Sequence, residues 1–123
     1  MQVGPLKLKV QLTCGDGFAL GPGKADLLDA IIAHGSISAA GRAIGMSYRR
    51  AWLLVDEMNR CFDPVLVETL RGGGQERGAR VTETGRAILA AYRALEDEAA
   101  ALAMRPACAQ LLAHLRPEPR PTH

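Results

Sequence analysis

One short segment of the chain carries side chains whose types and spacing suit contact with nucleic acid. Ser47, Tyr48, Arg49 and Arg50 follow a turn signal at Gly45. Serine is a good N-cap, so the three larger side chains fall on the first turn of a new helix. Such a helix can enter the major groove of DNA by its N-terminus, where an arginine can bond a guanine through two hydrogen bonds. The alternative is that the two arginines only form a solvated helix face.

Three further residues near this segment each have two possible roles. Ser36 and Ser38 can cap the preceding helix, or donate to a DNA phosphate at its N-terminus, and the two roles are compatible. Trp52 lies four residues after Tyr48, so the two rings share one helix face. Trp52 either packs near the DNA backbone or the following hairpin, or belongs to the core.

A basic, glycine-rich stretch follows between residues 71 and 80. Arg71, Arg77 and Arg80 flank a run of glycines that includes Gly73. Glycines permit close approach of the backbone, so this hairpin tip can reach a phosphate or the minor groove. The alternative is a mobile surface loop without a partner.

Elements that position these residues can be read from the apolar periodicity. Residues 6–12 alternate as a half-buried strand does, a turn signal follows at 15–17, and residues 18–20 can return as a second strand. Three helices are expected next, over residues 24–34, from the cap at Ser36 or Ser38, and from the cap at Ser47 to about Arg60. Strands at 65–70 and near Val81 enclose the basic tip.

The C-terminal part predicts one long helix with a repeating apolar seam. Thr82 can cap a helix over residues 83–104, and residues 107–115 can add a short helix before a Pro-rich, disordered tail. A stripe on the long helix is either buried within one chain or forms a two-fold dimer contact, and we favour the dimer. Its residues are Ile88, Ala91, Tyr92, Leu95, Ala99 and Leu102.

Composition narrows the function classes. The 123 residues suit one domain, and no apolar run is long enough for a membrane span. With no signal peptide and three widely spaced cysteines, we expect a cytoplasmic protein with free thiols. No metal-ligand spacing, cofactor motif, P-loop or catalytic set stands out, so neither an enzyme nor a metal site is expected. Net charge is only +2, but arginine makes up most of the basic residues, which fits phosphate recognition or a GC-rich coding bias.

The expected order of elements is that of a winged helix-turn-helix domain. The fold class is therefore mainly α with a small β-sheet, with an N-terminal β-hairpin and a long C-terminal dimerisation helix. Residues 1–104 would form the DNA-binding domain with its dimerisation helix, and residues 105–123 the short helix and tail.

Several segments in the right order resemble the N-terminal domain of ModE-type regulators, relatives of the LysR-type winged helix-turn-helix proteins. The resemblance covers about residues 6–98. The matching points are Gly35-Ser-Ile-Ser38, Ser47-Tyr48, Ala51-Trp52, Glu57-Met58-Asn59, Gly72-Gly-Gly74, and Thr82 with Gly85. The resemblance implies a transcriptional regulator that binds a pseudo-palindromic operator in double-stranded DNA as a homodimer, in molybdenum-related gene control.

One departure from this family concerns its effector. ModE proteins carry an oxyanion-binding domain after the long helix, but only about twenty Pro-rich residues follow Met104. We therefore expect no molybdate response from this chain alone, and the effector stays unknown. Two alternatives remain open: a sensor-less partner that dimerises with a full-length relative, or a small oxyanion-binding protein that uses helix N-termini and arginines.

Overall fold

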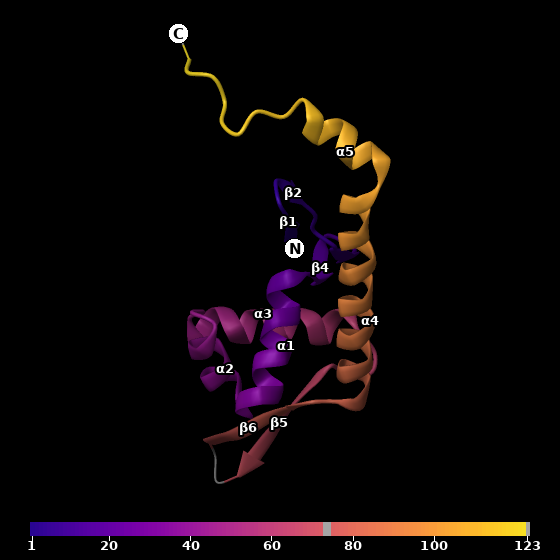
Figure 1. The fold of residues 1–123 in the computed structure, drawn as a ribbon. Helices are drawn as coiled ribbons and strands as arrows, with labels where there is room; N and C mark the ends of the chain where they lie inside the picture. The colour runs from indigo at the N-terminus through magenta and orange to yellow at the C-terminus, as the bar shows by residue number, and fades with distance from the viewer. Residues whose placement is uncertain (73–74, 123) are drawn as a thin grey trace.

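The computed structural model describes residues 1–72 and 75–122, with only the backbone described for residues 71, 72 and 75–77. Its elements follow one another as three short helices, a wing hairpin and a long helix, preceded by two small hairpins (Figure 1). Their bounds are β1 Gln2–Val3, β2 Leu6–Lys7, β3 Leu12–Cys14, β4 Gly17–Leu20, α1 Pro22–His34, α2 Ile37–Ala43, α3 Tyr48–Cys61, β5 Val67–Gly72, β6 Gln75–Val81, α4 Glu83–Ala100, the 3₁₀ helix η1 Ala101–Met104, and α5 Pro106–Ala113. This is a winged helix-turn-helix with an N-terminal hairpin and a long C-terminal helix, as the sequence predicts.

The core lies where α1 crosses α2, α3 and the base of the wing. Helix α1 buries one apolar face, and α3 buries a narrower stripe that leaves its other side free for solvent. Burial of a large apolar side chain stabilises the fold by about 1.5–3 kcal/mol, so this cluster accounts for much of the domain's stability. Its largest fully buried members are Leu20, Leu27, Leu28, Ile31, Ile37, Met58, Leu66 and Tyr92.

Helix α1 begins and ends at residues that the local sequence selects. It starts at Pro22, two residues before the expected start, because proline suits the first turn of a helix. It ends at Gly35, which has φ of 75° and donates its N–H to the Ile31 carbonyl at 2.8 Å. The same glycine also meets the wing, because its carbonyl accepts the N–H of Ala79 at 2.8 Å. The end of α1 and strand β6 are thus joined directly.

The wing pairs β5 with β6 in antiparallel register, with Val67 opposite Val81 and Glu68 opposite Arg80. Strand β6 begins at Gln75, so the hairpin is longer than expected and its strands extend into the glycine-rich stretch. Gly78 has φ of 153°, and a Cβ there would lie 2.8 Å from the Gly35 carbonyl oxygen. The wing therefore needs a glycine where it touches α1.

The N-terminal segment differs from the prediction of one strand over residues 6–12. Strand β2 pairs with β1, and β3 pairs separately with β4, so the stretch is divided into two hairpins. Between them the backbone bonds elsewhere: the Val10 carbonyl accepts the Tyr92 hydroxyl at 2.7 Å. A contact with α4, distant in sequence, thus replaces strand pairing at this point.

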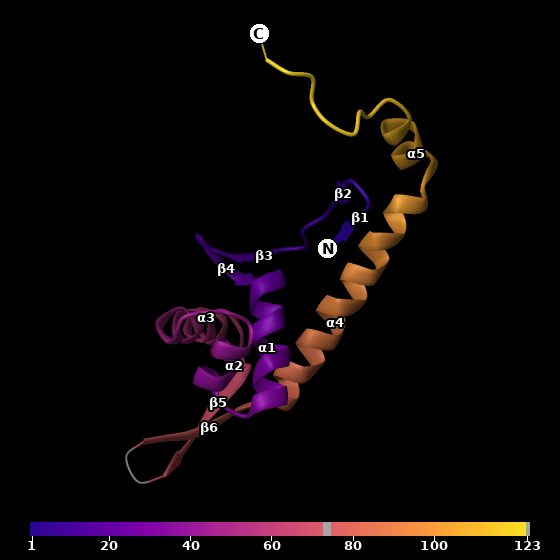
Figure 2. The same cartoon turned by 60° about the vertical axis from the view of Figure 1, so that its left-hand side comes forward.

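Helix α4 runs beside α1 and then projects beyond it, with α5 at its far end (Figure 2). Its regular part ends at Ala100, and η1 completes the segment that was expected to be helical to Met104. Arg93 fastens α4 to α1 through Asp26 at 2.8 Å and Asp29 at 2.7 Å, and also bonds Glu96 at 2.7 Å. Burial opposes the charge of Arg93, but its hydrogen bonds to the three carboxylates outweigh this and raise the pKa of the guanidinium.

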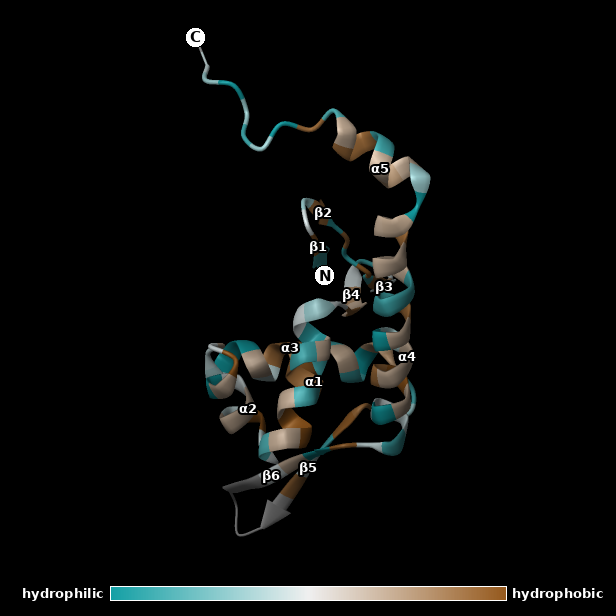
Figure 3. Ribbon diagram, viewed as in Figure 1, coloured by the Kyte–Doolittle hydropathy of each residue, from teal (hydrophilic) through white to brown (hydrophobic). Residues whose placement is uncertain are grey.

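The C-terminal elements are apolar but sparsely covered. Figure 3 shows brown, hydrophobic residues along α5, which lies away from the packed helices. Residues 114–122 contain no helix or strand. Within the described part of the chain, no helix combines the length and the apolar character that crossing a bilayer requires.

Candidate nucleic-acid interface

The turn between α2 and α3 fixes the start of α3. Gly45 has φ of 73°, a conformation that favours glycine, and the Met46 N–H donates to the Gly41 carbonyl at 2.8 Å. A Cβ on Gly41 would lie 3.1 Å from the Ala51 Cβ, so the two helices approach closely at this point. Ser47 then caps α3 by accepting the Arg50 N–H at 3.1 Å. The helix-turn-helix geometry is therefore set by local residues.

The first turn of α3 presents large polar side chains to solvent. Tyr48 is 57% exposed, and Arg49 and Arg50 are exposed as well. Among the described residues, no ion pair engages either arginine. Ala51 and Val55 are buried beneath this turn, so the helix that carries the three side chains is packed against the core.

Trp52 takes the core role that the sequence left open, and its contact with DNA remains a prediction. It is half-buried and packs against the core, while its ring meets Tyr48 edge to face with centroids 6.1 Å apart. Its Nε1 is buried and has no hydrogen-bond partner within the described part of the chain. Together with Arg49, Leu53 and Asp56, the two rings line a shallow hollow of about 510 Å³ on the outer side of α3.

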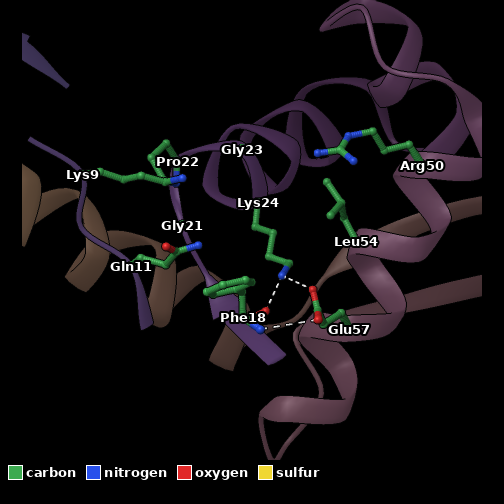
Figure 4. A pocket seen from close by; sticks show the side chains of 10 residues that line it. All are labelled: Lys9, Gln11, Phe18, Gly21, Pro22, Gly23, Lys24, Arg50, Leu54 and Glu57. Carbon is green, nitrogen blue, oxygen red and sulfur yellow. Dashed lines mark hydrogen bonds and ion pairs between the residues drawn. The ribbon is translucent and has the colours of Figure 1, made fainter. Parts of the chain in front are cut away.

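A second hollow of about 310 Å³ lies between α3, the start of α1 and the N-terminal segment (Figure 4). Lys9 and Arg50 line it from opposite sides, and Gln11, also of the N-terminal segment, lies beside Gly21. Two cationic side chains near the N-terminus of α1 give this hollow a positive character, which suits a phosphate oxygen. Lys9 and Gln11 were not among the site residues expected from sequence.

The floor of this second hollow is an ion pair between a buried lysine and a half-buried glutamate. The Lys24 ammonium is nine-tenths buried and donates to the Phe18 carbonyl and to Glu57 Oε1. Glu57 Oε2 accepts the Phe18 N–H at 3.4 Å. The hydrogen bond from Lys24 is the main cause that lowers the pKa of the Glu57 carboxyl, against the opposing effect of burial. The pair joins strand β4, α1 and α3.

The two serines of α2 differ in position. Ser36 is the N-cap, because its Oγ accepts the Ala39 N–H at 3.0 Å, while Ser38 is half-buried inside the first turn. The capping role of Ser36 is thus confirmed, whereas phosphate contact by either serine remains a prediction.

The wing arginines are not equivalent. Arg80 lies near the base of the wing, and its guanidinium pairs with Glu68 at 2.6 Å. Its charge is thus partly neutralised within the chain. Arg71 and Arg77 lie in β5 and β6, but their side chains are not described, and Gly73 lies outside the described residues.

Asn59 fixes the wing to the far end of α3. Its Nδ2 donates to the Val67 carbonyl at 2.9 Å, and its Oδ1 accepts the N–H groups of Leu66 at 2.9 Å and Val67 at 3.1 Å. Thr82 completes the joint, because its hydroxyl donates to the Val65 carbonyl at 2.8 Å and accepts the Gly85 N–H at 3.0 Å. Asn59 thus links α3 to the start of β5, and Thr82 links the start of α4 to the segment before β5.

The expected dimer stripe is divided between the core and the surface. Tyr92 is only 2% exposed and bonds Val10, so assigning it to a dimer contact was wrong, and Ile88 packs partly against the core. Leu95 and Leu102 are 48% and 49% exposed, which leaves the distal part of the stripe uncovered. Ala91 is exposed and Ala99 is half-buried beside them.

Comparison with known proteins gives the family. The chain is 38% identical to the molybdenum-pterin-binding protein MopA of Rhodobacter capsulatus over 96 residues, 78% of this chain and 36% of that protein. It is 40% identical to the molybdenum transport protein ModE of Azotobacter vinelandii over 90 residues, 73% of this chain and 33% of that protein. The DNA-binding transcriptional dual regulator ModE of Escherichia coli K12 is 37% identical over 71 residues, 58% of this chain and 27% of that protein.

The chain is homologous to the ModE-type regulators. It spans about a third of the length of the curated ModE and MopA relatives it matches. No protein-family model matches this ModE homologue. Among solved structures, the complex of the CbnR DNA-binding domain with DNA resembles it with a TM-score of 0.55 at 22% identity, covering 72% of this chain and 95% of that one. At this identity the likeness establishes the winged helix-turn-helix fold alone.

Among the described residues, no group of three or more histidine, cysteine, aspartate or glutamate side chains could hold a metal ion. The first turn of α3 itself presents hydrogen-bond donors and two cationic side chains.

Proposed function

We propose that this ModE homologue is a transcriptional regulator that binds a specific, pseudo-palindromic DNA operator as a homodimer. The observation that carries the proposal is the first turn of α3, where Tyr48, Arg49 and Arg50 are exposed on a helix capped by Ser47. This is the part of a recognition helix that meets base edges in the major groove.

Base reading is assigned first to Arg49. It lies beside Tyr48 and Trp52 on the outer side of α3, where an arginine can form two hydrogen bonds with guanine O6 and N7. The shallow hollow that the two rings and Leu53 line suits contact with a thymine methyl group. Arg50 lines the other hollow on the side opposite Lys9, so its guanidinium is suited to a base edge or to the phosphate that flanks it.

Phosphate contacts are assigned to the two sides of α3. On one side lie the cationic hollow with Lys9 and the start of α1, and on the other side lies the wing with Arg71, Arg77 and Arg80. Such contacts fix the register of the protein on the duplex, whereas base contacts select the sequence. Because Arg80 is paired with Glu68, we expect it to contribute less than a free arginine would.

Dimerisation is assigned to the distal part of α4. Leu95 of α4 and Leu102 of the following η1 are exposed large apolar residues of this stripe, and the small residues Ala91 and Ala99 permit close helix approach. A two-fold axis there would place two α3 helices on successive half-sites of an operator, about one helical turn apart.

A selection of binding sites tests the proposal. The purified protein is incubated with a library of random DNA duplexes, and bound duplexes are amplified and sequenced over several rounds. We expect enrichment of a motif with two inverted half-sites. The Arg49→Ala protein should lose sequence preference at one position of each half-site, while Arg86→Ala, which alters an exposed arginine of α4, should select the wild-type motif. Absence of any enriched motif would refute specific DNA binding.

A further inference from the structure

Two cysteines that lie far apart in the sequence meet at the C-terminal end of α3. Cys14 ends strand β3, and Cys61 is the last residue of α3. They line one hollow of about 240 Å³ together with Gly17, Glu57 and Arg60. Neither cysteine belongs to the surface around Tyr48 and Arg49 at the other end of the helix.

The β3–β4 hairpin is held against α3 at this point (Figure 2). Glu57 accepts the Phe18 N–H on one side and the Lys24 ammonium on the other. A Cβ on Gly17 would lie 3.1 Å from Glu57 Oε2, so the hairpin backbone lies directly on the helix one turn before Cys61. The approach of the two cysteines is therefore fixed by the fold rather than by their own side chains.

The two thiols interact and differ in accessibility. A hydrogen bond with the Cys14 thiol, followed by burial, raises the pKa of the Cys61 thiol. Cys14 is exposed, whereas Cys61 is half-buried, and the third cysteine, Cys108, is buried in α5. An oxidant from solvent thus meets Cys14 first, with Cys61 in place as its resolving partner.

We propose that Cys14 and Cys61 are a redox modification site, which forms an intramolecular disulfide by exchange with a low-molecular-weight disulfide. The Cys14 thiolate attacks one sulfur of the disulfide and releases the first small thiol. The Cys61 thiolate then attacks the Cys14 sulfur of the mixed disulfide and releases the second. The two protein thiols together lose two electrons and two protons, and one small disulfide is reduced to two thiols.

The bond would link the hairpin to the recognition helix. The loop it closes contains α1, α2 and α3, so it restrains the unfolded chain and should raise the thermal midpoint of unfolding. The inference concerns the opposite end of α3 from the proposed base-reading residues and does not depend on DNA binding.

The test uses oxidised glutathione and mass spectrometry of the whole protein. After incubation and acid quenching, we expect wild-type protein to lose the mass of two hydrogen atoms, and peptide mapping to find Cys14 joined to Cys61. Cys61→Ser should instead carry one glutathione on Cys14. Cys108→Ser is the matched control and should behave as wild type does.

Three outcomes would overturn the inference. These are separate glutathione adducts on both Cys14 and Cys61, a disulfide that involves Cys108, or thiols that stay reduced while a small reference dithiol is oxidised. Circular dichroism of each serine variant establishes that it is folded, and a higher thermal midpoint of the oxidised wild type, reversed by reductant, is the second readout.

Discussion

The Asn59 side chain holds the backbone of Val67 from both sides, accepting its N–H at 3.1 Å and donating to its carbonyl at 2.9 Å. This contact joins the last turn of α3 to the first residue of β5. Helix α3 and the start of the wing are therefore held together directly. Two elements that are proposed to meet the same DNA duplex keep a fixed spacing.

Loss of the contact between Asn59 and Val67 should destabilise the folded protein. Asn59→Ala leaves the backbone groups of Leu66 and Val67 without partners, and we expect the free energy of unfolding to fall by about 1–3 kcal/mol. Urea unfolding measures this change. Asn59→Asp keeps the acceptor for the two N–H groups and should lose less. Equal losses in the two variants would show that the accepted hydrogen bonds do not matter.

Removing the partner of Arg80 should strengthen DNA binding. Glu68→Gln frees the guanidinium for a phosphate, so the slope of log affinity against log salt should steepen by about one unit. The exposed pair itself contributes only about 0.2–1 kcal/mol to folding, so the fold should persist. Titrations at several salt concentrations measure the slope, and the Glu68→Gln/Arg80→Ala double variant should lose the gain. If the salt slope of the Glu68→Gln variant equals that of the wild type, Arg80 lies away from the duplex.

The acid stability of the protein should depend on Glu57. Its pKa is lowered in the folded chain, so the stability it contributes is present above the ordinary carboxyl range and is lost as pH falls through the lowered value. Glu57→Gln should therefore flatten the fall of the thermal midpoint between about pH 5 and pH 2. Asp56→Asn, which alters an exposed neighbour on α3, is the control. The hypothesis fails if the two variants give the same pH profile.

Leu95 and Tyr92 should have separable roles. Leu95→Asp places a charge from each protomer at the proposed dimer contact, where each buried leucine side chain would contribute about 1.5–3 kcal/mol. We therefore expect this variant to be a folded monomer. Tyr92→Phe loses the bond to Val10, so unfolding should become easier by about 0.5–1.5 kcal/mol while the oligomeric state is unchanged. Light scattering and thermal unfolding measure the two effects. A Leu95→Asp protein with the wild-type mass would remove this stripe from any dimer contact.

Features that depend on neighbouring residues could be predicted from the sequence. The caps at Ser47 and Thr82, the cap at Ser36 as one of two candidate serines, and the turn at Gly45 follow from local hydrogen bonding and from the conformational freedom of glycine. These local features fix the element order, and hence the winged helix-turn-helix.

Contacts between distant segments could not be predicted in the same way. The bond from Tyr92 to Val10 converts an expected dimer residue into core and interrupts an expected strand. The pairing of Lys24 with Glu57, and the hollow that holds Lys9, likewise require the packing of β4 and α1 against α3. Periodicity gives the face of an element, but not the partner that covers it.

The central claim, sequence-specific DNA binding through the first turn of α3, is tested most directly by an affinity ratio. Fluorescence anisotropy at fixed salt would compare binding of the wild-type protein to its selected operator and to a scrambled duplex of equal length and composition. We expect a ratio of about 10³ or more for the wild type, with Arg49→Ala lowering it about tenfold or more and Arg86→Ala leaving it unchanged. Equal affinity of the wild-type protein for the two duplexes, or an Arg49→Ala ratio equal to that of wild type, would contradict the account.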